Sequence, residues 1–321
     1  MIAIRRRAWF GLASAWLAGA ATAVGPDLPP FGLGDFDREE PISITADQLE
    51  ARDDQGRRTL AFRRDVEVRQ GPLRLSAEVL EAVYVDGDSQ PRSLSASGGV
   101  EIREGTRRAR CGQALYDRPA QSIVCRGDPA ELWDGNDRLA GGVISFDLAR
   151  KSVRVEGGTE VEIHRELADV DLAEAGADAE ILERVRGKGP VTIRAAGLEA
   201  SDSANERRIR FAGDVVLRHG GIELRAQELE AVYPPQATQP DRLIARENVV
   251  LTEGEREARC AYAEYHLPER RIACEGDAVL RDHEDHLAGD RIAFDFESRQ
   301  VDAVGRTRLR VQSTRLDREG R

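Results

Sequence analysis

The chain has 321 residues, a formal net charge of −11 and a charged fraction of 33%. A protein this acidic repels nucleic acid, and no row of Lys or Arg stands out against that charge, so nucleic-acid binding is excluded as its function. The length and the mixed-sign charge suit a soluble protein of two ordinary domains.

Residues 1–23 have the pattern of a secretory signal peptide. The basic run Arg5–Arg7 precedes an uncharged stretch, Ala8–Ala23, which ends in small residues and is shorter than the roughly 20 apolar residues of a spanning helix. We therefore predict export to the periplasm through a cleavable signal. If the segment is retained, it would instead anchor the protein in the inner membrane. Three prolines among acids and glycines predict a disordered lead-in over residues 24–40.

The rest of the chain is an internal repeat. When the sequence is shifted by 149 residues, it overlays itself, and equivalent residues coincide at Phe62/Phe211, Cys111/Cys260, Tyr116/Tyr265 and Cys125/Cys274. We predict two tandem domains, residues 41–163 and 190–312. Residues 164–189 are expected to form a linker with a short helix near Ala179–Val185, and residues 313–321 a charged tail.

Turn-like dipeptides recur about every 30 residues in each copy, as at Arg64-Asp65, Gly98-Gly99 and Gly213-Asp214. Between them, apolar and polar residues alternate, as at Val66/Val68 and Leu73/Leu75. Period-two alternation bounded by turn residues predicts half-buried antiparallel strands. We therefore expect an all-β protein in which stacked rungs of a few short strands bury one another's apolar faces.

The four cysteines form two equivalent pairs, each separated by 14 residues. A turn lies between the members of each pair, at Asp117–Ala120 in the first copy and near Pro268 in the second. A hairpin centred there would place the two cysteines of a pair opposite one another, and export favours their oxidation. We predict the disulfides Cys111–Cys125 and Cys260–Cys274. Four buried thiols are the alternative.

Enzyme signatures are absent from the sequence, which contains no Gly-x-Ser-x-Gly, His-Glu-x-x-His or phosphate-binding loop. The densest polar cluster, His283–His286, matches a turn in the first copy and is interpreted as a solvated loop. A metal site there would need further ligands. We expect no catalytic residue, no metal and no cofactor.

Alternating apolar residues define one face of the predicted strands in both copies. They would line either a closed, side-chain-filled core or an open groove that accepts acyl chains, and the pattern alone does not separate these. The residues are Ile42, Ile44, Leu60, Phe62, Val66, Val68, Leu73, Leu75, Val100 and Ile102, with Val191, Ile193, Ile209, Phe211, Val215, Leu217, Ile222, Leu224, Val249 and Leu251 in the second copy.

The order of several short motifs resembles the OstA/LptA-type family of lipopolysaccharide-transport proteins. Residues 41–49 resemble its opening strand, and residues 62–68, 73–84, 114–117 and 139–144 continue the match in order. Phe211–Val215 matches in the second copy, whereas the first copy has Arg64 where the family prefers glycine.

This resemblance implies a twisted antiparallel β-jellyroll, or β-taco, whose open apolar groove holds the acyl chains of lipopolysaccharide. It also implies end-to-end self-association through edge strands, and partners in the inner and outer membranes that the bridge would connect. A structural β-solenoid scaffold without lipid remains the alternative.

Overall fold

The computed structural model describes residues 42–164 and 189–310, apart from 89, 204, 236, 238, 296, 297 and 299. Every regular element in these ranges is a β-strand, so the all-β prediction is confirmed. The predicted signal peptide, lead-in, linker helix and tail lie outside the described residues.

The strands of the first copy are short at its two ends and long in the middle. They are β1 (Ser43–Thr45), β2 (Gln48–Asp54), β3 (Arg57–Gln70), β4 (Leu73–Val85), β5 (Ser93–Glu104), β6 (Arg107–Asp117), β7 (Ser122–Asp134), β8 (Asp137–Asp147), β9 (Ser152–Glu156) and β10 (Thr159–Ile163).

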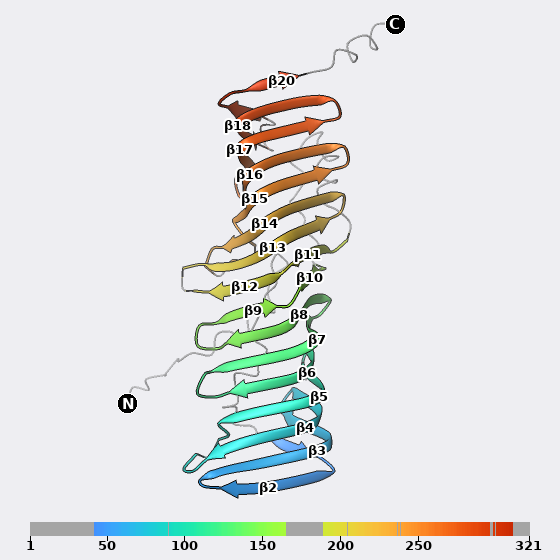
Figure 1. Cartoon of the computed structure of the whole chain (residues 1–321), viewed down its shortest axis with the longest axis vertical. Helices are drawn as coiled ribbons and strands as arrows, with labels where there is room; N and C mark the ends of the chain where they lie inside the picture. The colour runs from blue at the N-terminus through green and yellow to red at the C-terminus, as the bar shows by residue number, and fades with distance from the viewer. Residues whose placement is uncertain are drawn as a thin grey trace, which may run out of the picture.

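The second copy repeats this series. Its strands are β11 (Val191–Ala195), β12 (Gly197–Asp202), β13 (Arg207–His219), β14 (Ile222–Tyr233), β15 (Arg242–Glu253), β16 (Arg256–His266), β17 (Arg271–Asp282), β18 (Asp285–Asp295), β19 (Gln300–Val304) and β20 (Arg308–Arg310). All twenty belong to one sheet, and each pairs antiparallel with its neighbours. The strands lie across the long axis of the molecule and stack along it, as Figure 1 shows.

The recurring dipeptides lie inside long strands, so the prediction that they separate short strands was wrong. In β3, β5 and β13, for example, two residues with positive φ interrupt the pairing at Arg64-Asp65, Gly98-Gly99 and Gly213-Asp214. The facing strand contributes a single residue at each of these points. Such bulges bend a strand sharply. The dipeptides are therefore corners that fold each long strand into two arms.

The corners tolerate side chains because their geometry adapts. At Gly98 and Gly213, φ is 81° and 82°, a region that favours glycine, whereas Arg64 and Glu247 have φ of 64° and 62°. The lower values lie in the left-handed region that non-glycine residues reach at modest cost. The departure at Arg64 therefore leaves the bend of β3 intact.

Inward-facing residues form rows that cross every strand of the sheet. One row links Phe62, Leu80 and Ala96 in the first copy and continues through paired residues to Phe211 and Leu229 in the second. The buried residues of both copies form one hydrophobic cluster. Cross-strand burial of this kind stabilises a sheet. The two copies thus share a single continuous interior.

The copies meet at a joint formed by four short strands, β9–β12 and β10–β11. Val155 lies opposite Leu198, and Val161 lies opposite Ile193. Leu198 is only 3% exposed, whereas its equivalent in the first copy, Leu49 on the end strand β2, is 60% exposed. The joint therefore buries a surface that the first copy leaves open.

We expect Leu198→Ala to lower the free energy of unfolding by about 2–5 kcal/mol, because the substitution leaves a cavity in the joint. Leu49→Ala, in the same Leu-Glu-Ala sequence, should cost less than about 0.5 kcal/mol because its side chain is exposed. Urea unfolding of both variants checks this. Equal losses would contradict the burial of Leu198 at the joint.

A second expectation concerns the corner at Gly213, where an added Cβ would lie 2.7 Å from the Cβ of Ala196. Gly254, in the turn between β15 and β16, also has positive φ but no atom within 4 Å of an added Cβ. Gly254→Ala should cost about 1 kcal/mol through backbone strain, and Gly213→Ala about 1–3 kcal/mol more through overpacking. Thermal unfolding of the pair measures the difference, and similar losses would show that the corner is not tightly packed.

Candidate functional site

The predicted groove residues share one face of the sheet. Val68, Leu75 and Ile102 lie opposite one another on β3, β4 and β5, and Leu217, Leu224 and Leu251 repeat this row on β13, β14 and β15. Ile42, just before β1, is 50% exposed. The half-buried residues are Ile44, Leu60, Phe62, Val68, Leu75, Leu217, Ile222, Leu224 and Leu251. The buried ones are Val66, Leu73, Val100, Ile102, Val191, Ile193, Ile209, Phe211, Val215 and Val249.

Further apolar residues point inward beside the predicted set, most of them on the remaining strands. The row through Ile102 continues across β6, β7, β8 and β10, and the row through Leu251 continues across β16, β17 and β18. The same alternation marks them in the sequence, so extending the pattern along each strand would have found them. They are Leu132, Leu139, Ile144, Val155, Val161, Leu229, Leu280, Leu287 and Ile292.

The interior is not equally accessible along its length. In the row through Ile102, the residues Leu132, Leu139 and Val161 are at most 4% exposed. In the second copy, by contrast, Leu217, Leu224, Leu251, Leu280 and Leu287 are all half-buried. The interior is therefore closed in this row from β5 to β10 and more accessible along β13–β18, as it is at Val68 and Leu75 on β3 and β4.

Both predicted disulfides are present, but their register differs from the expectation. The turn between β6 and β7 places Ala114 opposite Cys125, while Cys111 lies three residues away at the corner of β6. The pairing of β6 with β7 is interrupted beside Cys111, between Arg110 and Gln113. There the Cα atoms of Cys111 and Cys125 are 5.8 Å apart, a separation that a disulfide spans. Cys260–Cys274 repeats the arrangement, again with a Cα separation of 5.8 Å. Each bond ties two strands together beside a corner.

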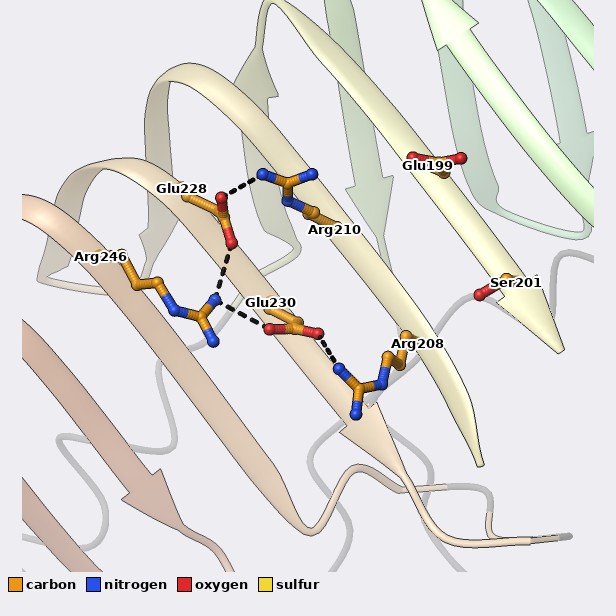
Figure 2. A pocket seen from close by; sticks show the side chains of 7 residues that line it. All are labelled: Glu199, Ser201, Arg208, Arg210, Glu228, Glu230 and Arg246. Carbon is orange, nitrogen blue, oxygen red and sulfur yellow. Dashed lines mark hydrogen bonds and ion pairs between the residues drawn. The ribbon is translucent and has the colours of Figure 1, made fainter. Parts of the chain in front are cut away.

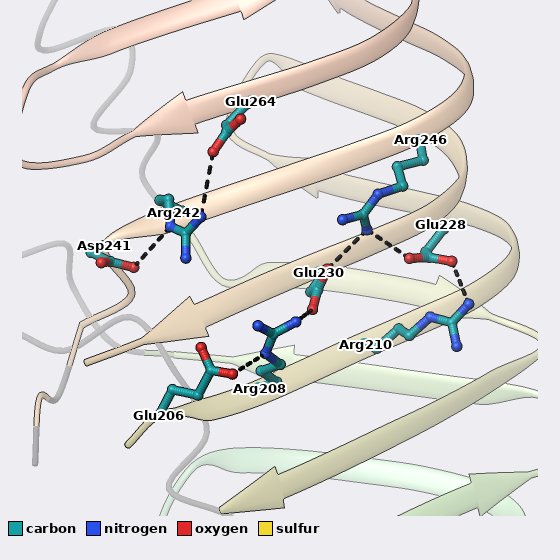
Figure 3. A network of polar contacts seen from close by, with 9 residues as sticks. All are labelled: Glu206, Arg208, Arg210, Glu228, Glu230, Asp241, Arg242, Arg246 and Glu264. Carbon is teal, nitrogen blue, oxygen red and sulfur yellow. Dashed lines mark hydrogen bonds and ion pairs between the residues drawn. The ribbon is translucent and has the colours of Figure 1, made fainter. Parts of the chain in front are cut away.

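The outer face of the second copy carries a network of arginines and glutamates, shown in Figures 2 and 3. Arg246 donates to Glu228 at 2.7 Å and to Glu230 at 2.8 Å, and Arg208 donates to Glu230 at 2.9 Å. Hydrogen bonding from Arg210 lowers the pKa of Glu228. These groups line a shallow depression on the outer side of the sheet.

The network satisfies its own charges and is specific to the second copy. The first copy has Thr59, Ala61, Val79 and Ser97 where the second has Arg208, Arg210, Glu228 and Arg246. Glu230 is only 6% exposed, but Arg208 and Arg210 extend into solvent. Paired, hydrogen-bonded charges of this kind are typical of a partly solvated surface. We therefore interpret the network as part of that surface.

The polar cluster His283–His286 spans the turn between β17 and β18 and the first two residues of β18, and His283 contacts Asp282 and Glu255. Among the described residues, no three His, Cys, Asp or Glu side chains are placed to hold a metal ion. This part of the chain also contains no helix long and apolar enough to cross a membrane.

Ion pairs reinforce the joint between the copies on its outer side. Arg194 of β11 donates to Glu160 of β10 at 2.7 Å, and Arg138 of β8 donates to the same carboxylate at 3.1 Å. Hydrogen bonds from Arg194 and Arg138 lower the pKa of Glu160. A carboxylate that accepts these hydrogen bonds favours its charged form. The stability that Glu160 adds to the joint therefore depends on pH.

Comparison with known proteins defines the class of this chain. A family model described as "LptA/(LptD N-terminal domain) LPS transport protein" matches residues 43–152 and 192–300, one segment in each copy. Because these segments make up more than half of the sequence, the chain belongs to this family.

A solved structure is also similar to the chain: LptH of Pseudomonas aeruginosa, described as the LptA-homologous periplasmic component of the lipopolysaccharide transport device. The identity is 23%, the match covers 38% of this chain and 85% of LptH, and the TM-score is 0.32. No curated protein sequence matches the chain.

The lowered pKa of Glu160 predicts a pH-dependent loss of stability. Its folded-state pKa lies below the ordinary value of 4.5, so its contribution is present above that value and is lost as the pH falls through the folded pKa. Glu160→Gln should therefore destabilise the protein at pH 7, and the difference from wild type should shrink towards zero below about pH 4. Urea unfolding across this range tests the prediction, with the exposed turn variant Glu269→Gln as control. A loss independent of pH would contradict it.

Proposed function

We propose that this protein is a periplasmic carrier that binds the acyl chains of lipopolysaccharide along its inward-facing apolar rows. The observation that carries this proposal is the continuity of those rows across the joint, from the first copy into the second. A continuous apolar path lets a lipid pass from one copy to the next without exposing its chains to water. Membership of a lipopolysaccharide-transport family supports the same conclusion.

The half-buried leucines of the second copy are the surface on which we expect the protein to bind lipid. Leu217, Leu224 and Leu251 lie side by side on adjacent strands. Each methylene that moves from water onto such a surface gains about 0.8 kcal/mol, so an acyl chain of ordinary length has a large driving force to enter. Because this binding needs no bond-making chemistry, the protein acts as a carrier and not as an enzyme.

Two features support a periplasmic location. The chain begins with a signal-peptide pattern, and both copies contain a disulfide, which persists in oxidising compartments. Retention of residues 1–23 would place the same interior at the inner membrane instead, and N-terminal sequencing of the exported protein distinguishes the two.

The ends of the sheet are suited to a bridge. In the described part of the chain, β1 and β2 pair only with β3, and β19 and β20 pair only with β18. Their outer edges are therefore open to strand addition. We propose that these edges connect the carrier to inner- and outer-membrane components of the transport pathway, which would extend the apolar path between the membranes.

The test uses a photo-crosslinking amino acid at neighbouring positions of opposite orientation. Leu251 faces the interior, whereas Val250 lies opposite the outward Arg225 and Arg259. With purified lipopolysaccharide, we expect at least about fivefold more crosslinking at Leu251 than at Val250, since acyl chains avoid the solvated face. Leu75 and Ser76 form the same comparison in the first copy.

Two outcomes of this experiment would contradict the carrier proposal. If the folded protein crosslinks lipid at neither Leu251 nor Leu75, the interior is a filled core and the protein is a structural scaffold. Crosslinking at Val250 equal to that at Leu251 would show adsorption of lipid aggregates to the surface. A circular-dichroism spectrum of each labelled protein controls for folding.

A further inference from the structure

The joint inside the chain shows what a complete connection between two of these units requires. Its interior is sealed by apolar pairs such as Val161 and Ile193, which are 2% and 6% exposed. On its outer side, Arg154 faces Glu199 with an ion pair of 3.0 Å. Glu160 faces Arg194 with an ion pair of 2.7 Å. The connection therefore combines an apolar seal with two charge pairs of opposite polarity.

Among the residues that the structure describes, none covers the carboxyl-terminal end of the sheet, which corresponds to one half of the same joint. A shift of 148 residues relates β19 and β20 to β9 and β10. Val301 and Leu309 are 44% and 69% exposed there, whereas their equivalents Val153 and Val161 are 5% and 2% exposed. Apolar side chains that are buried in one copy and exposed in the other indicate a binding surface. We therefore expect a further pair of strands to cover this end when the protein functions.

The charges at this end are reversed relative to the internal joint. Asp302 replaces Arg154, Arg308 replaces Glu160, and Arg310 replaces Glu162. These positions lie on the outer face, because Arg308 and Arg310 pair with Ala288 and His286 on either side of the inward pair Leu309 and Leu287. A strand with the charges of β11–β12 would therefore meet like charges at both places.

The amino-terminal end of the chain does not match this reversal. It carries Glu50 where the internal joint has Glu199, and Thr45 where the joint has Arg194. If two molecules joined in the internal register, Glu50 would face Asp302 and Thr45 would face Arg308. Such a contact gains no ion pair between directly opposite residues, whereas the internal joint has two. It places the carboxylates of Glu50 and Asp302 opposite one another, and the nearby Arg52 already donates to Glu50. The charges therefore favour self-association less than they favour the internal joint.

We propose that the carboxyl-terminal end binds a different protein in preference to a second copy of this chain. The partner presents an edge strand pair with apolar residues facing Val301 and Leu309, a basic residue facing Asp302 and an acidic residue facing Arg308. This inference rests on the proposed bridging function and adds to it the chemistry of the partner. The charges act as a selection device, because the apolar seal alone fits either partner.

A pair of peptides with identical composition provides the probe. The first has the sequence of residues 191–202, Val-Thr-Ile-Arg-Ala-Ala-Gly-Leu-Glu-Ala-Ser-Asp, which forms β11 and β12 in the internal joint. The second carries the exchanges Arg194→Glu and Glu199→Arg. Both are labelled with a fluorophore, and their binding to the mature full-length protein is measured by anisotropy. We expect the exchanged peptide to bind about tenfold more tightly, because two like-charge contacts become ion pairs.

The matched protein variant is Asp302→Arg/Arg308→Glu, which restores the charge pattern of the internal joint without changing the net charge. The preference should then invert, so that the first peptide binds more tightly. Inversion of a preference cannot arise from misfolding, which would weaken both peptides. Equal affinities, no binding of either peptide, or a preference that persists in the variant would each overturn the proposal.

Sedimentation velocity of the unliganded proteins gives an independent readout. The double variant should associate head to tail several-fold more tightly than wild type, because Asp302→Arg brings a guanidinium opposite Glu50. Wild-type self-association as tight as that of the variant would overturn the proposal. None of these measurements contains lipid, so their failure and a failure of lipid crosslinking are distinguishable.

Discussion

The whole structure depends on one geometric constraint: strands of 11–14 residues must bend in the middle while their neighbours bend at the same level. Two successive residues with positive φ make the bend in one strand, and a single facing residue accommodates it in the next. Stacking these corners turns a flat sheet into two arms with an apolar face between them. The disulfides lie beside the corners, where they hold neighbouring bends in line.

Much of this architecture follows from local patterns in the sequence. The duplication, the all-β class, the pairing of the cysteines and the inward face of residues such as Phe211 and Leu251 all derive from spacing and alternation. The lengths of the strands could not be predicted in this way. Gly98-Gly99 and Arg64-Asp65 have the composition of a turn whether the chain reverses direction or only bends there. The displaced register of Cys111 has another origin: the turn pairs Asp117 with Ser122, so its centre lies beyond Arg118, the midpoint of the two cysteines.

The candidate site shows a similar limit. Alternation identifies which side chains point inward, but it carries no information on how far apart the two arms lie. Ile102 and Leu251 are equivalent in the repeat, yet the first is buried and the second half-buried. That difference depends on contacts between residues far apart in the sequence, which the alternation along one strand does not encode. The copies thus share an apolar inner face, while their outer faces have diverged in charge, as Arg246 against Ser97 illustrates.

The stacking direction of the strands has a consequence for molecular dimensions. Each level of the sheet adds the spacing of one hydrogen-bonded strand, about 4.8 Å, and the described strands span about fifteen such steps, or roughly 70 Å. The length of the molecule along this axis therefore scales with the number of stacked strands. Each added strand lengthens the molecule by about 5 Å. Duplication of the whole unit therefore doubles the distance that one polypeptide can span. It also joins the two units through the polypeptide chain, where separate molecules would need a reversible contact.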